Sequence, residues 1–166
     1  MDTNTSALAR AHFIVANVPD PEIPALTLAD LGILRSVEEI DQQIVVTLTP
    51  TYSGCPATEA IKQDVNAQLV AHQITNARVQ ITLSPAWTTD WITAEGKEKL
   101  RAYGIAPPNC SANSQALMFA APGKGIACPR CESRLTERLS QFGSTPCKAL
   151  YRCTACKEPF DYFKPY

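Results

Sequence analysis

The sequence has few of the residues from which enzymes usually build catalytic sites. Its 166 residues include only two histidines, His12 and His72, both on predicted helices, where a surface role is commoner than metal binding. It contains no glycine-rich phosphate-binding loop, and no histidine lies near a candidate nucleophile in the sequence. We therefore expect an accessory protein and not an enzyme.

Long apolar runs and a strong net charge are also missing. No run approaches the roughly 20 apolar residues that cross a bilayer, and residues 1–10 lack the apolar core of a signal peptide. The net charge of −1 argues against general affinity for nucleic acids. With 45% hydrophobic residues the chain should fold. Because it lacks long apolar runs, a signal-peptide core and a strong net charge, we expect a cytoplasmic protein with neither membrane nor nucleic acid as partner.

The charge is unevenly distributed along the chain. Residues 1–121 hold 7 Lys and Arg against 12 Asp and Glu, whereas residues 122–166 hold 8 against 4. The arginines of this tail offer a second, less favoured hypothesis, in which it contacts phosphates through Arg130, Arg134, Arg138 and Arg152.

Cysteine, by contrast, is abundant and patterned. Cys128 and Cys131 form one C-x2-C pair, and Cys153 and Cys156 form a second after 21 intervening residues. Two such pairs predict one structural Zn²⁺ held by four thiolates, although Fe suits the same ligands and a thiol oxidoreductase is a minor alternative. Cys147 is a candidate competing ligand, and Cys110 has no assigned role.

The apolar patterns predict an α+β fold followed by a β-rich zinc ribbon. A helix before Pro19 is followed by a hairpin in which Ile44, Val46 and Leu48 share one face. A helix over 56–72 repeats apolar residues every four positions, and Val79, Ile81 and Leu83 alternate as a third strand. Thr93 can cap a later helix. The sheet thus has three or so strands with packed helices.

Composition suggests three segments. Residues 1–108 form the α+β domain, residues 109–121 a linker and first ribbon strand, and residues 122–166 the zinc ribbon.

Cys55 is the one cysteine with a local context for reactivity. If Pro56 takes the first helical position, Cys55 becomes the N-cap, where unpaired N–H groups and the helix dipole favour a thiolate. Gly54 would permit a close approach of the chain. An inert buried cysteine is an equally good interpretation of the local sequence.

Asp20 and Glu22 are the second candidate. Residues two apart on an extended segment point the same way, so both carboxylates could face one site. A solvated acidic turn is the plainer alternative.

These motifs resemble one family. Residues 20–24 (Asp-Pro-Glu-Ile-Pro), 30–33 (Asp-Leu-Gly-Ile), 51–56, Trp87 and 104–108 resemble the metal–sulfur cluster biosynthesis family over roughly residues 7–108. The tail, with Cys-Pro-Arg-Cys at 128–131 and residues 142–148, resembles the zinc-ribbon extension of the branch linked to aerobic phenylacetate breakdown.

The resemblance implies a maturation factor for the phenylacetyl-CoA 1,2-epoxidase, a multicomponent oxygenase. Its implied partners are the reductase and oxygenase subunits and the iron–sulfur assembly machinery, and a homodimer stays open. The family's reactive cysteine falls on Cys55 and its acidic motif on Asp20 and Glu22, a weak open set suited to passing on iron or an iron–sulfur cluster. A pure adaptor that carries no metal through Cys55 remains the alternative.

Overall fold

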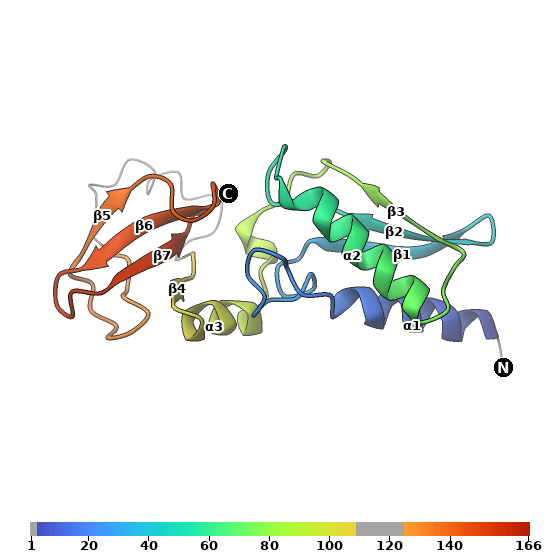
Figure 1. Cartoon of the computed structure of the whole chain (residues 1–166), viewed down its shortest axis with the longest axis horizontal. Coiled ribbons are helices and arrows are strands. Elements are labelled where there is room, and N and C mark those ends of the chain that lie inside the picture. The colour runs from blue at the N-terminus through green and yellow to red at the C-terminus, as the bar shows by residue number, and fades with distance from the viewer. Residues whose placement is uncertain (1–2, 109–124) are drawn as a thin grey trace. The chain divides into compact units, whose positions relative to one another are not determined.

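The computed structural model describes residues 3–108 and 125–166 (Figure 1). The chain divides into two compact units, Met1–Trp87 and Thr88–Tyr166, and each is described by itself. No helix in the described ranges has the combination of length and apolarity that spanning a membrane requires.

The first unit is built on a three-stranded sheet in the order β1-β2-β3. Strands β1 (Leu34–Ile40) and β2 (Gln43–Leu48) form the predicted antiparallel hairpin, closed by Asp41 and Gln42 at positive φ. Positive φ at both central residues matches the right-handed twist of the paired strands. β3 (Ala77–Ile81) pairs parallel to β2, and it ends before Leu83, which is exposed.

Two helices pack with this sheet. α1 (Thr3–Ala16) contacts β1, α2 (Ala57–Ala71) contacts β3, and the two helices contact each other, as Figure 1 shows. α2 is the crossover between the parallel strands β2 and β3, and it buries the predicted every-four stripe, consisting of Ala57, Ile61, Val65 and Leu69.

Three loops meet at one edge of the sheet. Leu34 at the start of β1 pairs with Leu48 at the end of β2, which pairs with Ile81 at the end of β3. The loop before β1, the β2–α2 connection and the loop after β3 therefore converge there. Backbone bonds join them, since Thr49 N–H donates to the Ile33 carbonyl at 2.9 Å.

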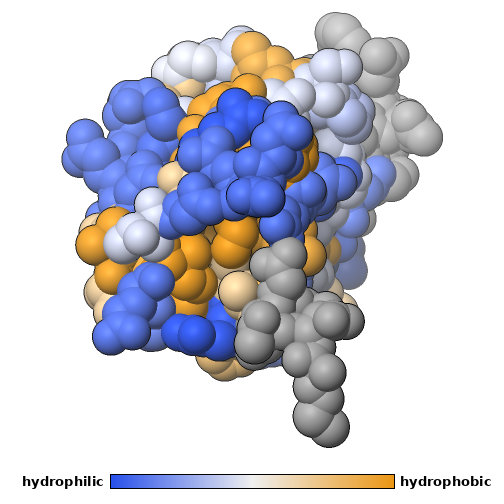
Figure 2. All heavy atoms as spheres, turned by 90° about the vertical axis from the view of Figure 1, so that its right-hand side faces the viewer, coloured by the Kyte–Doolittle hydropathy of each residue, from blue (hydrophilic) through white to orange (hydrophobic). Residues whose placement is uncertain are grey.

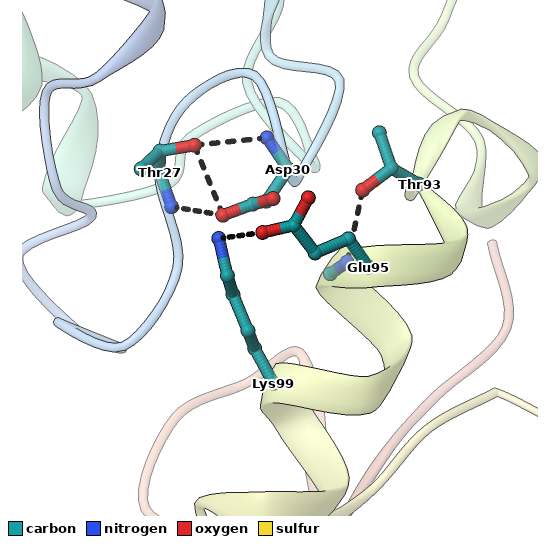
Figure 3. A network of polar contacts seen from close by, with 6 residues as sticks. Thr27, Asp30, Thr93, Glu95 and Lys99 are labelled. Atoms are coloured by element: carbon teal, nitrogen blue, oxygen red, sulfur yellow. Dashed lines mark hydrogen bonds and ion pairs between the residues drawn. The ribbon is translucent and has the colours of Figure 1, made fainter.

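Side-chain bonds fix the loop before β1. Trp87 Nε1 donates to the carbonyl of Leu31 at 2.9 Å, which ties the loop after β3 to it. Asp30 Oδ2 accepts hydrogen bonds from both the backbone N–H and the hydroxyl of Thr27, a closed turn visible in Figure 3. The edge is thus a set of braced turns, and it holds most of the motif residues.

The second unit begins with the 3-10 helix η1 (Thr89–Trp91) and α3 (Ala94–Ala102). Thr93 caps α3 as predicted, since its hydroxyl accepts from the N–H of Gly96 at 2.9 Å. Glu95 and Lys99 form an ion pair on the exposed face of the same helix (Figure 3).

The second sheet has the order β4-β7-β6-β5. Its strands are β4 (Ile105–Ala106), β5 (Thr136–Ser140), β6 (Lys148–Cys153) and β7 (Pro159–Phe163). Tyr151 stacks on Phe160 and meets Tyr162 edge to face, so the aromatic residues form its core together with Cys128 and Cys153.

The segment 88–108, which we assigned to the first domain from sequence, supplies β4 to this second sheet by pairing with β7. The expected limit at residue 108 therefore falls inside the second compact unit. The linker and first ribbon strand expected at 109–121 lie outside the described residues, and the three-part division stays a prediction.

Candidate functional site

The four ribbon cysteines come together as a single cluster. Cys128 and Cys131 lie on the turn before β5, Cys153 ends β6, and Cys156 lies on the turn leading to β7. Their sulfur atoms all lie within 4.8 Å of one another. The structure thus assembles the predicted ligand set from two distant segments of the sequence.

The two turns have the same local construction. The residue after the second cysteine has positive φ in each, 60° at Glu132 and 69° at Lys157. In one turn Cys128 N–H donates to the Ser133 carbonyl, and in the other Cys153 N–H donates to the Glu158 carbonyl. Each C-x2-C pair is therefore a tight knuckle that directs two sulfurs toward one point.

The sulfur spacing fits a tetrahedral metal ion. Cys128 Sγ lies 3.7 Å from Cys156 Sγ, and Cys131 Sγ lies 3.6 Å from Cys153 Sγ. Zn–S bonds of about 2.3 Å in a tetrahedron place sulfurs about 3.8 Å apart. All four thiols are free, and these distances are far longer than a disulfide bond. The set is complete with four sulfurs, so a bound Zn²⁺ would have no open position for chemistry.

Backbone N–H groups favour the thiolate form of one of these sulfurs, that of Cys153. The N–H of Cys156 donates to Cys153 Sγ at 3.5 Å, and this bond is the largest cause that lowers the pKa of Cys153, whereas the pKa of Cys131, whose sulfur lies 3.6 Å away, is raised because the two thiols share a proton. A thiolate at neutral pH is the form that binds Zn²⁺.

Cys147 is not part of the cluster. Its sulfur lies 3.0 Å from the hydroxyl of Thr145, and it is absent from the group of four whose sulfurs meet. Our suggestion that it competes as a fifth ligand is therefore wrong. Cys110 lies outside the described residues.

Cys55 lies at the edge of the first sheet where the three loops converge. The helix α2 begins at Ala57 with Pro56 as its N-cap, so our assignment of Cys55 as N-cap was one residue off. Pro56 already has helical φ and ψ, −65° and −25°, and the carbonyl of Cys55 accepts from the N–H of Thr58. Cys55 is thus the last residue before the helical turn.

The thiol of Cys55 is covered more than a freely reactive thiol would be. The residue is only 9% exposed, although Ser53, Gly54 and Pro56 beside it are exposed. Gly54 has φ +89° and open space around the position of a Cβ. Its role is therefore to permit the left-handed turn and not the close approach that we expected.

Asp20 and Glu22 do not present a matched pair of carboxylates. Asp20 is buried, and its Oδ1 accepts hydrogen bonds from the backbone N–H groups of Glu22 and Ile23 at 2.9 and 2.8 Å. Glu22 is half-buried. The Asp20 carboxylate closes its own turn, a role that the spacing of the two acids in the sequence did not suggest.

No second ligand cluster accompanies these residues. Within residues 3–108 and 125–166, the ribbon set is the one group of three or more His, Cys, Asp or Glu whose ligand atoms lie within 4.8 Å of one another. Cys55, Asp20 and Glu22 do not form such a group.

One residue of the edge where the loops converge escaped the sequence reasoning. Thr49 directly follows the central strand β2 and is 1% exposed, yet its hydroxyl has no hydrogen-bond partner among the described residues. A threonine after an apolar strand is ordinary in sequence, so no local signal could have singled it out.

Comparison with known proteins covers both parts of the chain. A family model described as an iron-sulfur cluster assembly protein matches residues 15–81, and one described as the PaaD zinc beta ribbon domain matches residues 108–164. Over 154 residues the chain is 47% identical to a protein of Escherichia coli (strain K12) that is described as a subunit of 1,2-phenylacetyl-CoA epoxidase. That match spans 91% of this chain and 88% of the relative.

Two further comparisons cover the first unit. The "Fe-S protein maturation auxiliary factor" of Porphyromonas gingivalis (strain ATCC BAA-308 / W83) is 30% identical over 89 residues, which are 52% of this chain and 84% of that protein. The crystal structure of a domain of unknown function, DUF59, from Bacillus anthracis has a TM-score of 0.53 at 23% identity. It covers 58% of this chain and 92% of its own, and it supports the fold alone.

Proposed function

Because this chain belongs to the PaaD family, which joins an iron–sulfur assembly domain to a zinc ribbon, we propose that it helps mature the phenylacetyl-CoA 1,2-epoxidase in the cytoplasm. It acts as a non-catalytic accessory protein that assists insertion of iron or an iron–sulfur cluster into the reductase or di-iron subunit. The relative's description as an epoxidase subunit supports this choice of client.

The proposal places the transfer step at Cys55. One observation carries it: the loops holding the motif segments at 20–33, 49–56 and 82–87 converge on one edge of the sheet, with Cys55 among them. A thiolate is a soft ligand that binds iron, and a single one binds weakly enough to release it. The half-buried carboxylate of Glu22, in the loop before β1, is the proposed second ligand, and Asp20 shapes the turn that carries Glu22.

The ribbon has a separate, permanent role. One Zn²⁺ per chain held by Cys128, Cys131, Cys153 and Cys156 stabilises the second unit, and iron or cluster is only a transient cargo of the first. The two metals therefore occupy different sites and have different lifetimes on the protein.

Maturation in cells tests the role of Cys55. Cells lacking this protein are supplied with the wild type, Cys55→Ser or Cys147→Ser, and the iron and cluster contents of the purified epoxidase subunits are measured. Cys147 is the matched control, because it is also a buried cysteine outside the zinc cluster. Loss of metal with Cys55→Ser alone is expected. Full metal content in epoxidase from the Cys55→Ser cells would reject the transfer role.

The cover over Cys55 favours a second candidate, a pure adaptor that brings assembly partners together without handling metal. Anaerobic incubation of the purified protein with Fe²⁺ and sulfide separates the two. Iron bound by the wild type and lost in Cys55→Ser supports transfer, whereas iron binding that is absent or indifferent to Cys55 supports the adaptor.

A further inference from the structure

A surface groove in the first unit takes no part in the site described above. It is formed between α1 and the C-terminal end of α2, with a volume of about 620 Å³. Residues of α1 and of the turn after it line one side, including Arg10, Phe13, Ile14 and Val18, and α2 adds Gln68 and His72. The lining residues that lie on α1 itself run from Ala9 to Ile14, about 8 Å at 1.5 Å per residue.

The apolar part of the groove is open to solvent. Phe13 is 70% exposed, which is unusual for the largest apolar side chain on an otherwise well-packed helix, while Val18 in the turn after the helix is buried. Figure 2 looks onto the end of the molecule where α2 finishes, and apolar side chains gather there between polar ones. Phe13 thus presents a large apolar surface to solvent.

The charge of the groove is opposite to that of its unit. Residues 1–87 hold 4 Lys and Arg against 9 Asp and Glu, yet among the described residues no carboxylate lines the groove and one of the four cations, Arg10, does. Arg10 Nη2 donates to the carbonyl of His72 at 3.0 Å, which joins the two walls. Within residues 3–108 and 125–166 no carboxylate forms an ion pair with Arg10, so its remaining N–H groups suit an anionic partner.

Shape selects the kind of partner. A groove between two helices fits the apolar face of a third short helix. His72 Nδ1 donates to the carbonyl of Gln68, so the α2 wall is fixed at the point where a partner's carboxylate would meet Arg10. Apolar contact with Phe13 and a charge contact with Arg10 lie three residues apart on one wall.

We propose that this groove binds a short amphipathic helix of an epoxidase subunit, with an apolar face against Phe13 and an Asp or Glu against Arg10. The inference rests on the proposed function for the identity of the partner. It gives the first unit a docking surface that is separate from Cys55, so that binding the client and passing on metal are different tasks of different residues.

Cross-linking from the groove tests the proposal. The photoreactive p-benzoylphenylalanine replaces Phe13 in the full chain, and the protein is irradiated with the purified reductase and oxygenase subunits. Phe142, 61% exposed in the ribbon, is replaced in the same way as the matched control. Mass spectrometry is expected to find Phe13 joined to a helical subunit segment that carries an acidic residue, and Phe142 not joined to it.

Affinities measured with the same subunits give the second arm. Phe13→Ala should weaken binding by about tenfold, and Phe142→Ala should leave it unchanged. Arg10→Glu should weaken it by a similar factor, more at low salt than at high salt, whereas Arg10→Lys should retain most of the affinity.

Four results would overturn the proposal: cross-links only to residues of the same chain, cross-links only to a second copy, cross-links only to bound small molecules, or affinities that none of these substitutions changes. Its failure is distinguishable from that of the transfer role, because Cys55→Ser should not alter docking. If Cys55→Ser abolishes maturation while the groove variants bind and mature normally, only the groove is wrong.

Discussion

The backbone N–H of Ile23 donates a buried 2.8 Å hydrogen bond to Oδ1 of Asp20. The same oxygen also accepts from the N–H of Glu22, and Asp20 N–H in turn donates to the Leu26 carbonyl. The carboxylate therefore replaces backbone partners that a tight turn with two prolines cannot supply. Asp20 therefore has a structural role in its own turn, independent of any role in binding iron.

Asp20→Ala should destabilise the first unit by about 1–3 kcal/mol, because one buried and one part-buried N–H group lose their acceptor. Asp20→Asn keeps an acceptor oxygen and should cost less than about 1 kcal/mol. Urea unfolding followed by circular dichroism measures both. Asp30→Ala is the matched control, since the Asp30 carboxylate braces Thr27 in the same way.

The Asn variant also separates structure from transfer. If the charge of Asp20 takes part in handling iron, Asp20→Asn will be stable and yet fail to mature the epoxidase. Equal maturation by Asp20→Asn and wild type would show that Asp20 only stabilises its turn and takes no part in handling iron.

Thr49→Val is expected to stabilise the protein by about 1 kcal/mol, because it removes a buried hydroxyl that has no hydrogen-bond partner among the described residues. Thr136→Val is the control. Thr136 is also buried, but its hydroxyl donates to the Ile126 carbonyl at 3.0 Å, so its loss should destabilise. Denaturant midpoints of the two variants should move in opposite directions. A lower midpoint for Thr49→Val would mean that the hydroxyl has a partner such as a bound water.

The parts of the fold that follow from local patterns were predictable from sequence. Alternation of Ile44, Val46 and Leu48 identified one buried face of β2, although Val45 on the other face is buried too, and the C-x2-C pairs identified the four sulfurs that meet. Both signals depend on the period of an element or on fixed ligand chemistry. Neither signal depends on contacts with distant segments of the chain.

The remaining features depend on contacts between distant segments. Pairing of β4 with β7 joins residues about 55 positions apart, and no local pattern announces it. The cover over Cys55 and the turn closed by Asp20 are likewise set by neighbouring backbone in three dimensions. Spacing alone therefore suggested two carboxylates facing one site, where the structure has one carboxylate bound to its own loop.

Gly143→Ala should destabilise the ribbon by about 1–3 kcal/mol through overpacking. A Cβ at Gly143 would clash with Oδ1 of Asp161, whose carboxylate also accepts from the Ser144 hydroxyl and lies 3.8 Å from Lys148 Nζ. Thermal unfolding measures the change. Gly143→Ala combined with Asp161→Ala should recover part of the loss, and a double variant no better than the sum of the single ones would show that the clash is not the cause.

Removal of the metal should loosen the second unit. Cys128 and Cys153 belong to the same buried cluster as Tyr151, Phe160 and Tyr162, so the ligands and the aromatic core share their packing. Wild type is expected to contain about one Zn²⁺ per chain, and Cys128→Ser well below that, with loss of the near-ultraviolet circular dichroism of the aromatic residues.

Cys147→Ser is the matched control for this experiment, because Cys147 is buried in the same unit without touching the cluster. It should keep its zinc and its aromatic signal. Zinc retention should also fall as the pH is lowered, since every ligand must be a thiolate to bind and protons compete for the sulfurs. Full zinc in Cys128→Ser, or equal loss in Cys147→Ser, would contradict the four-sulfur site, and an unchanged aromatic signal after zinc loss would contradict its structural role.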